Sequence, residues 1–281
     1  MNNFLNRLVY GRSNKPDYTR EAMAKESRQK QFFDILSVKY GHLIILNLIL
    51  VFFMLPLIFW TWMNFSPALE ISAAERAGYN LVYSFGLIPC LLFMAAPLAG
   101  ICYIIKNFTQ DKHVWLWKDF FANTKSNAKQ ALLYMLFYSV VLAIGQVVLY
   151  SYNFIIDASP VVPILRGIYI AIYILFILSA IYAFPMMVTY DLKLKDIIKN
   201  SLLFTIGALG TTFLAPLLAL IPFILLSVLS VFWGYGAIIL GLFYLIFGFG
   251  LALYIIISFT TAVFEKHMNK KSEEDEEAAA K

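Results

Sequence analysis

Residues 200–264 read NSLLFTIGALGTTFLAPLLALIPFILLSVLSVFWGYGAIILGLFYLIFGFGLALYIIISFTTAVF, a stretch of 65 residues without Asp, Glu, Lys, Arg or His. A water-soluble domain cannot bury so long an uncharged apolar segment in its own core. A spanning helix needs about 20 apolar residues, so the stretch crosses a bilayer twice. Its midpoint, Trp233-Gly234-Tyr235-Gly236, suits a turn at the membrane surface, where aromatic residues are enriched. The segment therefore predicts a polytopic membrane protein.

Composition supports a single membrane domain. Hydrophobic residues make up 61% of the 281 residues and charged residues 14%, whereas soluble domains carry roughly 25% charge. We expect an all-α protein with a basic tail at residues 1–40, a six-span transmembrane domain at 41–264 and an acidic tail at 265–281. The acidic tail includes the run Ser272-Glu273-Glu274-Asp275-Glu276-Glu277, which is typical of a disordered segment or a docking site for a basic partner.

Windows bounded by charged residues define six predicted spans. They cover residues 43–63, 79–104, 131–156, 167–190, 202–231 and 237–263. Several windows contain proline, which kinks membrane helices for shape or as a hinge. The fifth window holds Gly207, Gly210, Pro216 and Pro222 and predicts either a strongly kinked helix or a re-entrant segment.

The distribution of basic residues predicts the orientation of the chain. Of the 22 Lys and Arg residues, eight precede the first window, five lie in residues 106–129, three in 193–199 and four after Phe264. These loops and both tails share one side when six spans cross the membrane, and only Arg76 and Arg166 fall on the other. By the positive-inside rule we expect both termini to be cytoplasmic.

The predicted loop between the second and third spans is rich in aromatic and basic residues. At helical spacing, Lys118, Lys125 and Lys129 lie close to one line, and Trp117, Phe120 and Phe121 form a neighbouring stripe. We therefore expect an amphipathic helix in this loop. It is either an anchor that places lysines among anionic headgroups or a docking surface for a partner protein. The candidate contact residues are Trp115, Trp117, Lys118, Asp119, Phe120, Phe121, Lys125, Asn127 and Lys129.

A second amphipathic stretch precedes the first span. Phe32, Phe33, Leu36 and Tyr40 recur at helical spacing, so this part of the tail either lies as a helix among the headgroups or is a solvated tail that orients the protein.

The predicted loop between the second and third spans, together with the end of the second span, carries a resemblance to a known family. The motifs are Pro97-Leu98-Ala99-Gly100, Lys106-Asn107-Phe108, Trp117-Lys118-Asp119-Phe120 and Lys125-Ser126-Asn127-Ala128-Lys129-Gln130. In these motifs the chain resembles the YesL-type family of bacterial integral membrane proteins, which has no established biochemical activity. The resemblance implies a multi-pass protein of the bacterial cytoplasmic membrane with an accessory role in carbohydrate uptake or sensing, and a protein partner in sugar import or sensing. Pro97, Gly100, Asn107 and the later Pro185 are the predicted kink and turn residues.

The sequence contains no recognisable catalytic or cofactor-binding pattern. The three histidines, His42, His113 and His267, lack the spacing of a helical metal site, and a phosphate-binding glycine loop is missing. Cys90 and Cys102 are twelve residues apart in one predicted span, so they cannot form a disulfide with each other. We expect no enzyme activity, no metal, no cofactor and no nucleic-acid partner.

Uncharged polar residues within the spans leave two functions open. Asn47, Gln146 and Thr211 either line a cavity or form hydrogen bonds between helices. The first hypothesis is a non-enzymatic accessory or regulatory membrane protein that contacts a partner through the loop helix. The alternative is a permease-like transporter component or a channel for a neutral small solute, which requires a polar cavity near the middle of the membrane.

Overall fold

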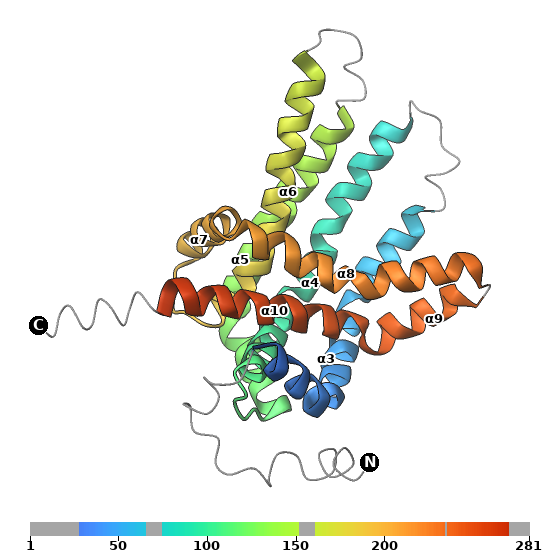
Figure 1. Cartoon of the computed structure of the whole chain (residues 1–281). Coiled ribbons are helices and arrows are strands. Elements are labelled where there is room, and N and C mark those ends of the chain that lie inside the picture. Colours follow the sequence, from blue (N-terminus) through green and yellow to red (C-terminus); the bar gives the residue numbers. More distant parts are fainter. Residues whose placement is uncertain (1–27, 66–74, 152–160, 234, 270–281) are drawn as a thin grey trace, which may run out of the picture.

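The structure is a computed structural model that describes residues 28–65, 75–151, 161–233 and 235–269 (Figure 1). Within these ranges six helices are long and apolar enough to cross a membrane, which confirms the predicted all-α, six-span class. The elements are α3 (Arg28–Phe65), α4 (Glu75–Thr109), α5 (Leu116–Ser151), α6 (Val161–Met187), α7 (Leu194–Gly207), α8 (Leu209–Phe232), α9 (Gly236–Phe243), the π-helical turn η3 (Tyr244–Gly248), α10 (Phe249–Phe264) and the π-helical turn η4 (Glu265–Asn269).

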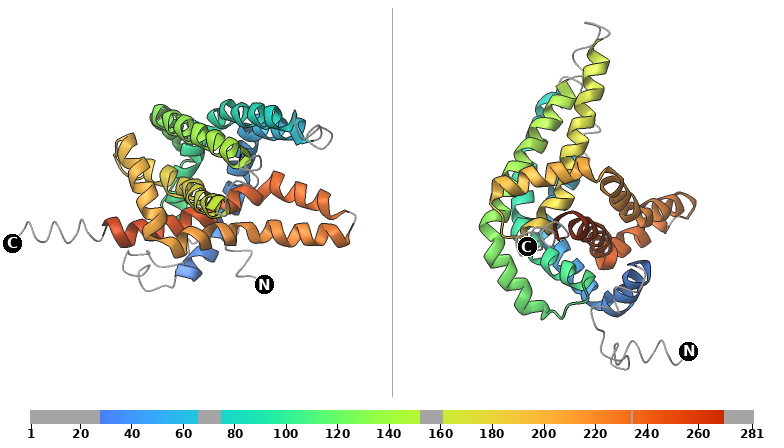
Figure 2. Two further views of the ribbon diagram at one scale, coloured as in Figure 1. Left: turned by 90° about the horizontal axis from the view of Figure 1, so that it is seen from above. Right: turned by 60° about the vertical axis from the view of Figure 1, so that its left-hand side comes forward.

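The helices form three antiparallel hairpins. These are α3 with α4, α5 with α6, and α8 with α9, η3 and α10 (Figure 1). Figure 2 shows that the hairpins diverge from a shared region, where α10 passes against α3, α4, α6 and α8. The core lies in this shared region and contains the fully buried side chains of Leu43, Ile104, Tyr134 and Ile257.

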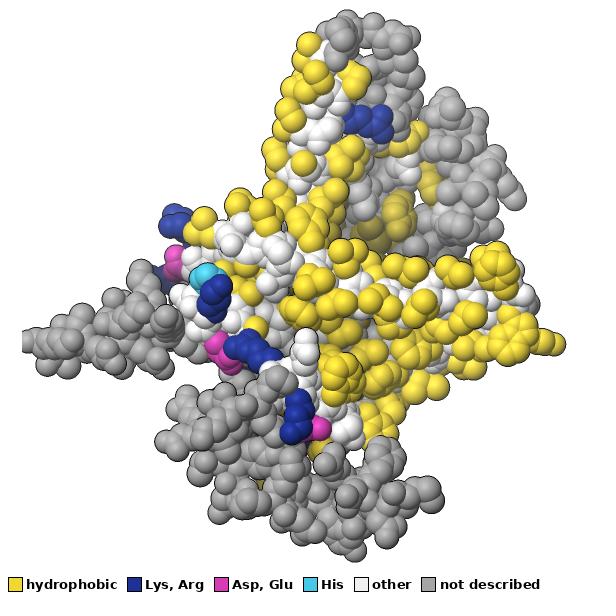
Figure 3. All heavy atoms as spheres, in the orientation of Figure 1, with side chains coloured by type: hydrophobic (Ala, Val, Ile, Leu, Met, Phe, Trp, Pro, Cys, Tyr) yellow, Lys and Arg dark blue, Asp and Glu magenta, His cyan; other side chains and the backbone are white. Residues whose placement is uncertain are grey.

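The surface divides into a charged end and long apolar flanks. Figure 3 shows Lys, Arg, Asp and Glu gathered beside α7, η4 and the start of α3, while hydrophobic side chains cover α8 and α9. We call the charged side the basic end; it contains the described cations of residues 28–39, 106–129, 193–199 and 266. The tips of the three hairpins point away from the basic end in different directions (Figure 1), and we call them together the far end. Exposed Trp62, Val231 and Phe232 near those tips form the kind of surface that a bilayer covers.

The third predicted span and the loop helix before it are one continuous helix. α5 runs without a break from Leu116 to Ser151, so the amphipathic segment is not a separate helix in the loop. At 1.5 Å per residue its 36 residues measure about 54 Å along the curved helix axis, more than a hydrocarbon core of about 30 Å requires (Figure 2). Residues 152–156 of the predicted span lie outside the described ranges.

The first span is also longer than its apolar window. α3 continues from Arg28 to Phe65, so the boundary predicted at residue 40 lies inside a helix. The ring of Phe32 packs on Tyr254 of α10 at 4.8 Å between centroids, and the Tyr254 hydroxyl donates to the Phe32 carbonyl at 3.0 Å. Phe33 and Tyr40 are exposed. This stretch is therefore partly a packed segment of the bundle.

The fifth predicted span is divided into two helices. α7 ends at Gly207 and α8 begins at Leu209, because Ala208 leaves the helical conformation with φ −120° and ψ 44°. The Thr212 hydroxyl lies 3.1 Å from the Thr205 carbonyl and 3.0 Å from the buried Tyr182 hydroxyl, so side chains provide partners at the break. The 24 residues of α8 can cross the bilayer alone.

Candidate functional site

The amphipathic half of α5 follows a tight turn that ends α4. The carbonyl of Asn107 accepts hydrogen bonds from the backbone N–H groups of Gln110 at 3.2 Å and Lys112 at 2.9 Å. Asp111 adopts a left-handed φ of 51°, a conformation that Asn and Asp tolerate better than most residues. The turn reverses the chain within a few residues and directs it into α5.

Asp119 stabilises the start of α5. Its carboxylate accepts a hydrogen bond from the backbone N–H of Trp115 at 2.8 Å, and its own N–H donates to the Trp115 carbonyl at the same distance. A carboxylate that reaches back to the residue just before the helix resembles one half of a capping box and also suits the positive end of the helix dipole. Asp119, predicted as a contact residue, thus has a local structural partner.

Phe120 belongs to the core instead of the exposed stripe. Its side chain is 4% exposed, which corrects its prediction as a lipid or partner contact. The reason is a close crossing of α4 and α5 at Gly100. A Cβ atom at Gly100 would collide with the Thr124 hydroxyl and lie 3.0 Å from the Phe120 carbonyl oxygen. Glycine at this position therefore lets α5 approach near enough to bury Phe120.

The opposite side of the same segment is open. Trp117 and Phe121 are 55% and 63% exposed, and their rings stack at 6.2 Å between centroids with an interplanar angle of 22°. Trp115 and the lysines at 118, 125 and 129 are also exposed. On a helix, positions 117, 118, 121, 125 and 129 fall within about 120° of the circumference. We call Trp115, Trp117, Lys118, Phe121, Lys125 and Lys129 the aromatic–basic face.

Two further contacts hold this segment in place. Asn127 donates to the Asn123 carbonyl at 3.0 Å and to the Ser126 hydroxyl at 3.2 Å, so the bonds of this predicted contact residue stay within α5. The Gln130 amide donates to the Leu192 carbonyl at 2.7 Å, which ties α5 to the connection between α6 and α7. Sequence reasoning missed Gln130, because its partner lies 62 residues away.

Asn47 does not line a cavity. Its side chain is fully buried in α3 (0% exposed). The amide nitrogen donates to the carbonyls of Tyr244 at 3.2 Å and Leu245 at 2.7 Å, and the amide oxygen accepts the Gly250 N–H at 2.8 Å. These groups lie in and just after η3, where π-helical spacing interrupts the regular bonds of the sixth span. Asn47 is therefore an interhelical clamp: of the two alternatives for this residue, hydrogen bonding between helices holds and cavity lining does not.

The other two cavity candidates lie apart. Gln146 lines an open pocket of about 380 Å³ near the far end of α4, α5 and α6. Thr211 is half-buried on α8 and is not among the residues that line this pocket. Its neighbour Thr212 is the buried residue that bonds at the α7–α8 break.

The predicted kink residues Pro97 and Pro185 lie inside continuous helices. Pro97 lies inside α4 without interrupting it. Pro185 precedes the end of α6 by two residues, and its carbonyl accepts a hydrogen bond from the Thr189 hydroxyl at 2.6 Å. This bond satisfies a carbonyl that the end of the helix leaves free.

The described part of the chain contains no group of three His, Cys, Asp or Glu residues that could hold a metal ion. Comparisons with models of protein families, with curated proteins and with solved structures find no match to the chain. The resemblance to the YesL-type family, carried by the motifs between Pro97 and Gln130, stays a prediction.

Proposed function

We propose that this protein is a non-enzymatic accessory protein of the bacterial cytoplasmic membrane that binds a protein partner through the aromatic–basic face. The observation that carries the proposal is the stacked, exposed pair Trp117 and Phe121 beside exposed Lys118 and Lys125. Exposed aromatic residues next to cations are typical of the centres of protein interfaces.

The length of α5 favours a protein partner over lipid. Residues 131–151 account for about 31 Å of the helix, which is enough to cross the hydrocarbon core. Residues 116–130 add about 22 Å of helix at the basic end, where α5 curves away from the direction of its apolar half (Figure 2). This extension is rigid, because Phe120 is buried at the Gly100 crossing and Gln130 is bonded to Leu192. A rigid surface loses little conformational entropy on binding, which favours specific docking.

The chemistry of the face defines the partner. Three exposed lysines fit a partner segment that carries carboxylates, and the stacked rings fit an apolar side chain between those carboxylates. With the basic end in the cytoplasm, as the positive-inside rule predicts, the partner lies at the inner membrane surface. The resemblance to the YesL-type family favours a component of sugar import or sensing as that partner.

Site-specific photo-crosslinking tests the proposal. A photoreactive amino acid replaces Trp117, the full chain is expressed in native membranes, and cross-linked products are identified by mass spectrometry. The matched control carries the same group at Trp62, which is exposed near the far end. We expect a discrete protein adduct from position 117 that is absent from position 62 and that Lys118→Glu reduces at least fivefold. Cross-links from position 117 to lipid alone would contradict the proposal and assign the face to membrane anchoring.

A further inference from the structure

Arg166 is an exposed cation at the far end of the bundle. It is the sole Lys or Arg between residues 130 and 192 of the sequence. It lies five residues into α6, its side chain is exposed, and it takes part in no salt bridge with the described residues. A cation at or near membrane depth is costly unless it reaches the interface or finds a partner. The guanidinium of Arg166 therefore needs either water or an anion as its partner.

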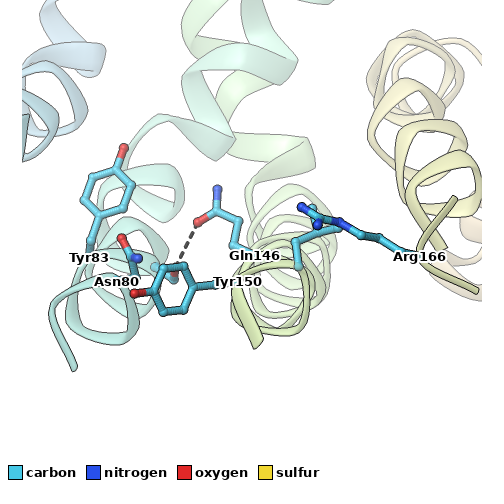
Figure 4. A pocket seen from close by; sticks show the side chains of 7 residues that line it. Asn80, Tyr83, Gln146, Tyr150 and Arg166 are labelled. Atoms are coloured by element: carbon cyan, nitrogen blue, oxygen red, sulfur yellow. Dashed lines mark hydrogen bonds between the residues drawn. The ribbon is translucent and has the colours of Figure 1, made fainter. Parts of the chain in front are cut away.

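Arg166 shares a pocket with polar side chains of two other helices. The pocket of about 380 Å³ is lined by Asn80, Tyr83 and Ser84 of α4, Gln146, Leu149 and Tyr150 of α5, and Arg166 of α6. Figure 4 shows Arg166 reaching from α6 towards α5, with Asn80 and Tyr83 on the wall formed by α4. Asn80, Tyr150 and Arg166 each lie within five residues of the far end of their helix.

The lining favours a ligand that accepts hydrogen bonds. It contains no Asp or Glu. The Ser84 hydroxyl donates to the Gln146 amide oxygen at 2.9 Å, which leaves the amide NH₂ as the donor of that side chain. Asn80 adds a second amide, and the guanidinium of Arg166 presents a planar fork of donors. Such a fork binds two oxygens of a phosphate group at once.

We propose that this pocket binds the phosphate group of an organic phosphate. Arg166 provides the charge and the bidentate contact, while Asn80 and Gln146 donate to the remaining oxygens. The volume lies near the lower end of the range of roughly 300–1,000 Å³ for small-molecule sites, so the pocket has room for more than a bare phosphate ion. Leu149, Tyr83 and Tyr150 also line the pocket. The phosphate belongs either to a phospholipid headgroup of the far leaflet or to a soluble phosphate ester.

Binding measurements on the full chain in dodecyl maltoside test the proposal. The probes are dioctanoyl phosphatidylglycerol, glycerol 1-phosphate and uncharged dioctanoylglycerol, each titrated by isothermal calorimetry. We expect at least one phosphate probe to bind, with the Kd raised at least tenfold by Arg166→Gln and about threefold by Arg166→Lys, which keeps the charge but loses the fork. Asn80→Ala should raise the Kd by two- to fivefold, and Arg28→Gln, an exposed arginine at the basic end, should leave it unchanged.

The pattern of binding identifies the source of the phosphate. Binding of the lipid without binding of glycerol 1-phosphate assigns the pocket to a headgroup, and binding of both assigns it to soluble phosphate esters as well. The proposal is overturned if neither phosphate probe binds, if dioctanoylglycerol binds equally well, if Arg28→Gln weakens binding as much as Arg166→Gln, or if Arg166→Gln binds normally. Unchanged elution volumes and melting temperatures of the variants exclude misfolding.

Discussion

We predict that the hydrogen bonds of Asn47 contribute measurably to the free energy of unfolding of the bundle. Asn47→Leu keeps the approximate shape of the side chain and removes three hydrogen bonds between α3 and the η3–α10 segment. Hydrogen bonds between membrane helices contribute on average about 0.6 kcal/mol each, with a maximum of about 1.7 kcal/mol. Three of them give about 2 kcal/mol, which corresponds to a change of about thirtyfold in the unfolding equilibrium constant.

The close approach at Gly250 supports this magnitude. A Cβ atom on Gly250 would lie 2.9 Å from the Leu43 carbonyl oxygen and 3.1 Å from Cβ of Asn47. The two backbones are therefore too close for a water molecule to enter and replace the amide. The carbonyls of Tyr244 and Leu245 lose a donor in the variant and gain none from solvent, which makes the loss more costly than at an exposed site.

Reversible unfolding in mixed detergent and SDS micelles, followed by circular dichroism, measures the change. Ser139→Ala is the matched control, because Ser139 is also buried and donates only to the Leu136 carbonyl of its own helix. We expect Asn47→Leu to lower the free energy of unfolding by about 2 kcal/mol and the control by less than about 0.5 kcal/mol. Faster amide exchange at Gly250 should accompany the loss. Equal free energies of unfolding for the two variants would refute the stabilising role of the Asn47 hydrogen bonds.

Three further predictions concern α5 and the orientation of the chain. Gly100→Ala should destabilise the bundle by about 1–3 kcal/mol through overpacking, whereas Gly41→Ala, with no atom within 4 Å of the added Cβ, should leave thermal stability unchanged or slightly raised. Asp119→Ala should lower stability by about 1 kcal/mol and increase amide exchange in the first turn of α5, as expected for a lost cap. In intact cells, an impermeant maleimide should label Arg166→Cys and spare Lys118→Cys; labelling of both from one side would contradict six crossings with a cytoplasmic basic end.

The six spans could be predicted from the sequence because bilayer thickness sets a minimum length for an apolar run. The ends of the helices could not be predicted in the same way. A charged residue ends an apolar window, yet Lys, Asn and Gln are compatible with a helix, so α5 continues through Lys125 and Lys129 into the predicted loop. An apolar run in the sequence indicates which residues lie in the hydrocarbon core. It does not indicate the residue at which the hydrogen bonding of the helix ends.

The roles of single residues depended on contacts that are remote in the sequence. Phe120 and Phe121 are adjacent aromatic residues in one stripe, and what buries the first is a glycine twenty residues earlier on α4. Asn47 is a single polar residue in an apolar run, and its partners lie about 200 residues later at an interruption in another helix. Periodicity within a helix could locate both residues on a face. It could not indicate which face meets another helix.

The two proposed binding surfaces are far enough apart to be tested independently. Both include residues of α5, and Lys129, the residue of the aromatic–basic face nearest to the pocket along the chain, precedes Gln146 by 17 residues, or about 26 Å along a continuous helix. Variants separated by more than about 10 Å, with no shared partner, have nearly additive effects. Lys118→Glu should therefore leave phosphate binding unchanged, and Arg166→Gln should leave the cross-link from position 117 unchanged. A reciprocal loss would mean that α5 shifts as a rigid unit, since its uninterrupted hydrogen bonding is the most direct physical connection between the two ends.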